Sequence, residues 1–220
     1  MKTIKTIIQT EFKIVSILCI VSSFSIFLLL FRMKLTHTNY YLFLVWNLFL
    51  AGVPYAISTY LNTIKKPNII YLLSICFFWL LFIPNAPYII TDLFHLKYSS
   101  QQLIWLDTLV IVAFAITGML LFLKSVYTME TIFKTYVKKP IVTFSLPFLF
   151  IIIGFGVYLG RFLRFNSWEI INKPMSIIKP ILDIITQPNL HQKAWQFTFI
   201  FGLFLWIGYE VFKRFIKLES

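Results

Sequence analysis

Six apolar runs dominate this sequence, and each is long enough to cross a lipid bilayer as a helix. A spanning helix needs about 20 predominantly apolar residues, within a range of roughly 17–25. Of the 220 residues, 59% are hydrophobic and only 13% are charged, whereas a soluble domain carries about 25% charged residues. The runs are Ile14–Phe31, Tyr40–Tyr60, Ile69–Ile90, Leu103–Leu123, Ile141–Gly160 and Trp195–Phe212.

This pattern predicts an all-α membrane protein, a bundle of about six transmembrane helices. We expect one integral membrane domain over residues 1–220, because nothing suggests an internal repeat or a second domain. Two connections between the runs, Ser125–Val137 and Pro180–Gln187, also place apolar residues at helical spacing. They predict short amphipathic helices at the membrane interface.

The third run is interrupted by Pro84 and Pro87. Proline removes a backbone donor and disfavours helical backbone in the residue before it, so we expect Ile83 and Ala86 to be extended. Asn85 lies between them and is expected to bond backbone groups that the prolines free. Irregular backbone at membrane depth is tolerated only where protein buries it or where it lines a wet cavity. The sequence therefore predicts a broken third helix beside a candidate site.

The charge balance indicates the membrane surface as a partner rather than nucleic acid. The formal net charge of +12 comes from 20 Lys and Arg against 8 Asp and Glu, and the basic residues cluster between apolar runs. Such residues anchor loops at anionic lipid surfaces. With the N-terminus inside, 12 of the 20 basic residues lie on the inner side. This bias predicts a bacterial inner (plasma) membrane protein with both termini in the cytoplasm.

Polar residues within or next to the runs collect at one face, which the same orientation makes extracytoplasmic. Ionisable groups there are costly and usually face a partner or a cavity. Asn47 lies roughly 10 Å deep from that face. The group comprises Asn47, Asn85, Asp92, His95, Asp107, Arg161, Arg164, Asn166, Glu169 and His191.

Within this group we assign candidate roles by chemistry. Asp92, His95 and Asp107 are the candidate catalytic residues, since carboxylates and imidazole are the usual proton carriers. Tyr88, Asp92, His95 and Ser99 would form a polar stripe on a helix. An Asp-x-x-His pair offers two metal ligands, but a metal site needs more, so no metal and no cofactor are predicted. The two cysteines lie inside apolar runs and indicate neither a disulfide nor a metal site.

The candidate ligand-binding residues are Asn47, Asn85, Arg161 and Arg164. The two arginines lie one turn apart, and they either extend to lipid headgroups or bind a carboxylate or phosphate bidentately. We predict that Asp92 or Asp107 pairs with one of them, because an unpaired charge at the hydrocarbon edge is costly. Just before them, Gly156-xxx-Gly160 would allow close helix packing.

Four blocks of the chain resemble a known family. They are WNLFLAGVPY (46–55), WLLFIPNAPYIITDLFHL (79–96), the region of Asp107, and GFGVYLGRFLRFNSW (154–168). Together they resemble the bacterial and archaeal membrane family called domain of unknown function 1361, over most of residues 40–190. One small departure is Trp105-Leu106-Asp107, where the family has Trp-Tyr before the aspartate. The resemblance implies the fold and membrane location, and no activity.

Three functions are compatible with these features. The polar cluster suggests a site that binds or acts on a polar or anionic ligand, such as a lipid headgroup or an envelope precursor. The same residues would suit a non-catalytic membrane subunit if arginine–carboxylate pairs only lock its helices. The broken third run and Asn47 suggest a small transporter or channel, although transporters often show repeated halves. No serine, cysteine or threonine stands in a recognisable nucleophile motif, so enzymatic activity stays open.

Overall fold

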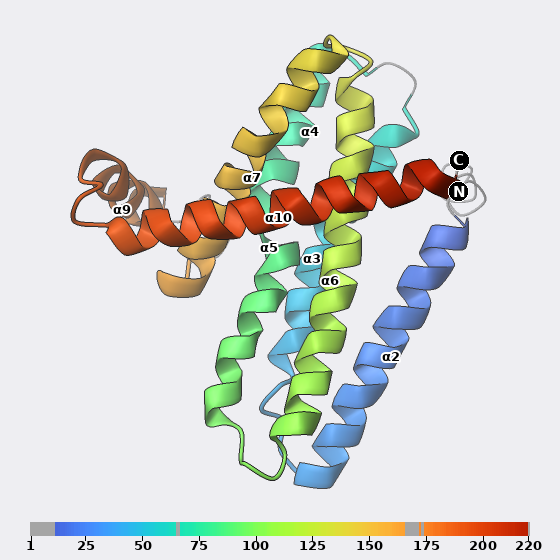
Figure 1. Ribbon diagram of the computed structural model, residues 1–220, viewed down its shortest axis with the longest axis vertical. Helices are drawn as coiled ribbons and strands as arrows, with labels where there is room; N and C mark the ends of the chain where they lie inside the picture. Colours follow the sequence, from blue (N-terminus) through green and yellow to red (C-terminus); the bar gives the residue numbers. More distant parts are fainter. Residues whose placement is uncertain (1–11, 65–66, 166–171, 173, 220) are drawn as a thin grey trace. The chain divides into compact units, whose positions relative to one another are not determined.

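The computed structural model describes residues 12–64, 67–165, 172 and 174–219, and every element within them is helical. In chain order the elements are α2 (Phe12–Thr36), α3 (Phe43–Asn62), α4 (Ile69–Phe82), α5 (Asn85–Tyr88), the 3₁₀-helix η1 (Ile89–Tyr98), α6 (Ile104–Phe133), α7 (Lys139–Phe162), α9 (Pro174–Thr186) and α10 (Gln192–Glu219) (Figure 1). This confirms the all-α prediction for the described residues.

Five helical stretches are long and apolar enough to cross a membrane. They are α2, α3, the stretch Ile69–Tyr98, α6 and α7. The sixth predicted run lies in α10, which is not one of the five. The prediction of several helices that are long and apolar enough to cross a membrane is therefore confirmed, whereas the number six stays a prediction.

The chain divides into two compact units, of which the first ends at Met129 and the second begins at Glu130. The first contains α2 to η1 and most of α6, and the second contains the end of α6 with α7, α9 and α10. In the first unit the series α4–α5–η1 lies alongside α3 and α6 (Figure 1). Whether these two units form the single membrane domain expected over residues 1–220 is not tested by this division, so that domain stays a prediction.

At the prolines of the third run, the helix changes type without becoming extended. Helix α4 ends at Phe82, yet Ile83 (φ −59°, ψ −32°) and Pro84 (φ −61°, ψ −24°) keep right-handed helical backbone. Ala86 lies inside α5. The prediction that Ile83 and Ala86 are extended is therefore wrong. The reason is that Pro84 is the N-cap of the new helix and Pro87 lies in its first turn, where a missing N–H breaks no helical bond.

Two contacts stabilise this change of helix type. Asn85 Nδ2 donates to the Phe82 carbonyl at 2.9 Å, which is the kind of contact predicted for it. On the other side, α6 approaches so closely that a Cβ on Gly118 would lie 2.7 Å from the Ala86 carbonyl oxygen. Glycine at position 118 thus lets α5 pack directly on α6, which places the start of η1.

Buried polar side chains also link the helices of the first unit. The Trp79 indole donates to Ser125 Oγ at 2.9 Å, and Ser125 Oγ lies 2.9 Å from the Pro54 carbonyl oxygen. In a bilayer, hydrogen bonds between helices favour helix association, because apolar side chains contact lipid as readily as they contact another helix. They join α4 and α3 to α6.

The connection Ser125–Val137 differs from its prediction. Helix α6 continues without interruption to Phe133, so most of this connection belongs to a membrane-spanning helix. Glu130, expected on the polar face of an interfacial helix, is buried, and Lys134 Nζ lies 2.6 Å from its carboxylate. The separate interfacial helix predicted here is therefore wrong, because an ion pair allows the charged residues to continue the span.

In the second unit, α10 crosses α7 at two glycines (Figure 1). A Cβ built on Gly154 would lie 2.7 Å from the Thr198 carbonyl oxygen and 3.1 Å from Gly202 N. The two backbones therefore touch, as small residues allow in membrane helices. Gly154 belongs to the same glycine run as Gly156-xxx-Gly160, whose packing role stays a prediction.

Candidate functional site

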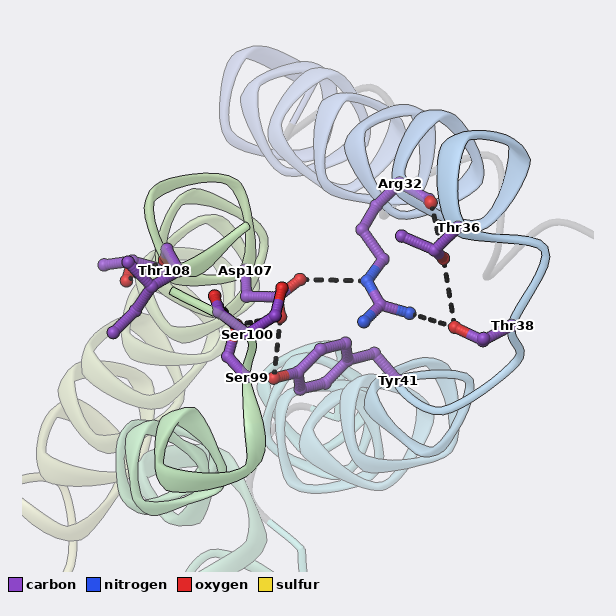
Figure 2. Close-up of polar contacts among 9 residues, drawn as sticks. Arg32, Thr36, Thr38, Tyr41, Ser99, Ser100, Asp107 and Thr108 are labelled. Carbon is purple, nitrogen blue, oxygen red and sulfur yellow. Dashed lines mark hydrogen bonds and ion pairs between the residues drawn. The ribbon is translucent and has the colours of Figure 1, made fainter. Parts of the chain in front are cut away.

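Asp107, in the first turn of α6, forms a buried ion pair with Arg32 near the end of α2 (Figure 2). Arg32 Nε lies 2.9 Å from Asp107 Oδ1, and the two side chains are 8% and 1% exposed. A charge-assisted bond of this length is among the stronger hydrogen bonds in proteins. Removing one partner would leave the other charge buried and uncompensated.

Three further side chains complete this network, which we call the Asp107 cluster. Asp107 Oδ2 accepts bonds from Ser99 Oγ at 2.5 Å and from the Tyr41 hydroxyl at 3.3 Å. Arg32 Nη1 donates to Thr38 Oγ1 at 2.5 Å, and the guanidinium carbon lies 4.7 Å from the centre of the Tyr41 ring. Both carboxylate oxygens of Asp107 thus have hydrogen-bond donors. The cluster therefore links α2 and α6 to the segment that follows η1.

Tyr41 is wholly buried, and burial raises the pKa of its hydroxyl well above the usual range. The neighbouring Asp107 carboxylate raises that pKa further. The hydroxyl therefore keeps its proton and stays a donor to Asp107.

A pH dependence follows from this shift. The folded protein holds the Tyr41 proton more tightly than the unfolded chain, so its contribution to stability is complete below pH 10 and declines as the pH rises above it. We expect Tyr41→Phe to lose less stability than wild type between pH 9 and 11, measured by thermal unfolding in detergent. Tyr98→Phe, at a residue 66% exposed, is the control and should behave as wild type. Equal losses in wild type and Tyr41→Phe would contradict the prediction.

A second cluster forms around Asp92 in η1, and we call it the His95 cluster. Asp92 is 1% exposed and accepts a bond from Asn47 Nδ2 at 2.8 Å. His95 Nε2 lies 3.9 Å from the other carboxylate oxygen. Because a 3₁₀-helix has three residues per turn, Asp92 and His95 lie one above the other on η1. The α-helical stripe predicted from Tyr88 to Ser99 does not form, because Asp92 and His95 lie in a 3₁₀-helix and Ser99 lies beyond its end.

His95 is the accessible member of its cluster. Its side chain is 28% exposed, and its Nδ1 lies 3.3 Å from the Tyr40 hydroxyl. The Phe43 ring centre lies 4.8 Å from the imidazole centre. A carboxylate, an imidazole and a phenol thus form a polar series, with steps of 3.9 and 3.3 Å, that ends at the surface of the first unit. Such a series can bind an anion or carry a proton.

Two short segments contribute residues to both clusters: the turn between α2 and α3, and η1 with the residue that follows it. Tyr40 and Tyr41 are neighbours in the turn between α2 and α3, and they contact His95 and Asp107 respectively. From the other side, η1 supplies Asp92 and His95, and Ser99 follows directly after it. Within the first unit, Asn47, Asp92 and His95 therefore lie in one cluster, and Asp107 lies in the other, to which the adjacent residue Tyr41 belongs. In the described residues no three His, Cys, Asp or Glu side chains converge as metal ligands.

Arg161 and Arg164 belong to the second unit. Arg161 lies in the last turn of α7, and Arg164 lies beyond its end with a left-handed backbone (φ 59°). Phe165 N donates to the Leu159 carbonyl at 3.2 Å, so this segment ends the helix. The pairing of these arginines with Asp92 or Asp107 stays a prediction. His191 contacts Asp183, and Asn166 and Glu169 lie outside the described residues.

Arg32 is the site residue that sequence reasoning missed. It is not among the candidate residues drawn from the sequence, and the structure pairs it with Asp107. A signal was present, because Arg32 directly follows an uninterrupted apolar run and is followed by Met33 before the next basic residue. Charged residues inside such runs usually have a partner.

Comparison with known proteins identifies the family. A search of curated proteins and a search of solved structures found no match. The family described as "Protein of unknown function (DUF1361)" matches residues 46–207, a range that includes Asn47, Asp92, His95 and Asp107. Because the match covers about three quarters of the chain, this protein belongs to the DUF1361 family.

Proposed function

We propose that this protein binds a polar or anionic ligand, such as a lipid headgroup or an envelope precursor, at the His95 cluster. The observation that carries the proposal is a partly exposed imidazole supported by a buried carboxylate. Asp92 stabilises the protonated imidazole, which then attracts an anion such as phosphate. In this proposal Asn47 and Tyr40 orient Asp92 and His95, and the Asp107 cluster supports the face on which they lie.

The same arrangement would suit acid–base chemistry on a bound ligand. His95 would carry the proton, and Asp92 would stabilise the charged imidazole in the manner of a buried carboxylate beside histidine. Lys97, two residues further along, adds positive charge at the same end of η1. Among the described residues, the side-chain contacts of Asp107 lie within its own cluster, so in this proposal it is a positioning residue rather than a catalytic one.

We further propose that the His95 cluster faces the extracytoplasmic side of a bacterial inner membrane, with both termini in the cytoplasm. The Lys and Arg distribution supports this orientation. This orientation requires α10 to cross the membrane as a sixth helix. Within the second unit, Trp195 near the start of α10 stacks on Phe155 of α7, and Lys213 near its end lies 3.8 Å from Glu130 of α6. The contact between α7 and α10 at Gly154 would then lie within the bilayer.

Histidine resonances test the binding proposal directly, because the chain contains only three histidines. The protein is labelled with ¹⁵N-histidine, placed in phosphatidylcholine nanodiscs and titrated with glycerol phosphate. We expect the His95 signal to move saturably, and His37 and His191 to remain unchanged. Asp92→Asn should weaken the apparent affinity, because it removes the charge that supports the imidazolium. No saturable shift, or equal shifts of all three signals, would contradict the proposal.

A second candidate function is a non-catalytic membrane subunit, and the closed Asp107 cluster favours it. The described contacts of that carboxylate are all with residues of the first unit, as expected for a residue that holds helices together. The two candidates differ in the effect of His95→Gln. Normal abundance with loss of the cellular phenotype would support ligand binding. Unchanged abundance and phenotype, together with loss of abundance in Asp107 variants, would support the structural role. His191→Gln is the matched control.

A further inference from the structure

Helix α9 in the second unit has three distinct faces. Ile177 and Ile184 form an inner face and are buried. Lys179, Asp183 and Thr186 form a polar face that is exposed. Between these two lies an apolar face whose side chains remain uncovered, with exposed fractions of 59, 39, 53 and 51% for Met175, Ile178, Leu182 and Ile185.

The uncovered face is continuous along the whole helix. Its four residues follow one another at spacings of three and four, so they lie on one side of the helix. A helix of 13 residues is about 20 Å long, which makes this a single apolar strip beside a charged one. A helix with a strongly polar face and an adjoining apolar face is typical of segments that lie in the membrane interface.

We propose that α9 lies flat in the interface of the lipid bilayer, with its uncovered apolar face inserted between acyl chains. Lipid is the occupant that the surroundings indicate. Helix α9 follows α7, which is a candidate membrane-spanning helix. In the same unit, α10 also exposes large apolar side chains such as Phe199 and Leu203. On the polar face, Lys179 can extend to lipid phosphates while Asp183 faces water.

Contacts at the end of α9 fix the angle at which this face is presented. Asp183 accepts a bond from Gln187 Nε2 at 2.8 Å, and His191 Nε2 lies 2.9 Å from its other oxygen. The Trp195 indole of α10 donates to the Ile184 carbonyl at 3.2 Å. Tryptophan is enriched at membrane interfaces because its ring is apolar and its N–H is polar. The apolar strip is thus held in one orientation relative to α10.

Spin labelling along α9 tests the proposal. Cys19 and Cys76 are first replaced by alanine, and single cysteines are introduced at the apolar-face positions Met175, Ile178, Leu182 and Ile185. The matched controls are Lys179→Cys and Thr186→Cys on the polar face. Each labelled variant is reconstituted in vesicles of phosphatidylcholine and phosphatidylglycerol. Collision rates with oxygen, which concentrates in lipid, and with a water-soluble nickel chelate are then measured.

The expected result is a periodic pattern. All four apolar-face positions should show a higher ratio of oxygen to nickel collisions than either polar-face control. Two outcomes would overturn the proposal. Equal ratios on both faces would mean that the strip faces water, and low collision rates with both reagents would mean that protein covers it. Because the proposed function rests on residues of the first unit, neither outcome bears on it.

Discussion

Replacing Arg32 with alanine is expected to destabilise the protein by about 3–5 kcal/mol, the usual cost of removing one partner of a buried ion pair. Asp107 is only 1% exposed, and Arg32 is its only cationic partner among the contacts described. Ser99 and Tyr41 would still donate to Asp107, but they carry no charge to offset it. The effect can be measured as the free energy of unfolding in mixed detergent micelles and as protein abundance in the membrane.

Two controls separate charge pairing from simple loss of a side chain. Lys34→Ala removes an exposed basic residue from the same turn of α2 and should change stability by less than about 0.5 kcal/mol. The double variant Arg32→Ala with Asp107→Asn should be less unstable than the sum of the two single variants, because no charge is left buried. Additive effects would contradict the pairing.

Gly154→Ala is expected to have the next largest effect, a loss of about 1–3 kcal/mol. The added Cβ would meet the Thr198 carbonyl oxygen at 2.7 Å and the Gly202 nitrogen at 3.1 Å. Both are backbone atoms, so they cannot move aside without shifting α10 as a whole. Gly154→Leu should be worse, because a longer side chain enlarges the same overlap. Unfolding in mixed micelles provides the measurement.

Another glycine of the same pair of helices provides the matched control. Gly208 lies in α10, and a Cβ at this position would meet nothing within 4 Å. Gly208→Ala should therefore stabilise the protein by about 0.5–1 kcal/mol, because alanine favours the helix more than glycine does. The two substitutions add the same methyl group and are expected to have opposite signs. A stable Gly154→Ala variant would show that the two helices do not touch there.

The helical class and most of the membrane-crossing segments could be predicted from the sequence, because the bilayer imposes a length and an apolar composition on each crossing. The local effect of the prolines was predicted less well. Steric rules disfavour a helix before proline, but they do not reveal that Pro84 and Pro87 would fall at the N-cap and in the first turn of a new helix. That placement depends on α5 packing against Gly118.

For the candidate site, too, some features could be predicted from the sequence and others could not. Counting spans predicts that Asn47, Asp92, His95 and Asp107 lie at one face, because topology alone assigns a residue to a side of the membrane, and this stays a prediction. Which groups pair with each other did not follow. Asp107 contacts Arg32, 75 residues away, and Asp92 contacts Asn47, 45 residues away.

By itself, then, the sequence determined the helical class and the segments that are long and apolar enough to cross a membrane, since both depend on local composition and on the length of the runs. Only the tertiary structure decided that Arg32 belongs to the Asp107 cluster, that a 3₁₀-helix aligns His95 with Asp92, and that Glu130 is buried beside Lys134. These features depend on which helices become neighbours and at what rotation. The free energy of burying a charge depends on a partner that is distant in sequence.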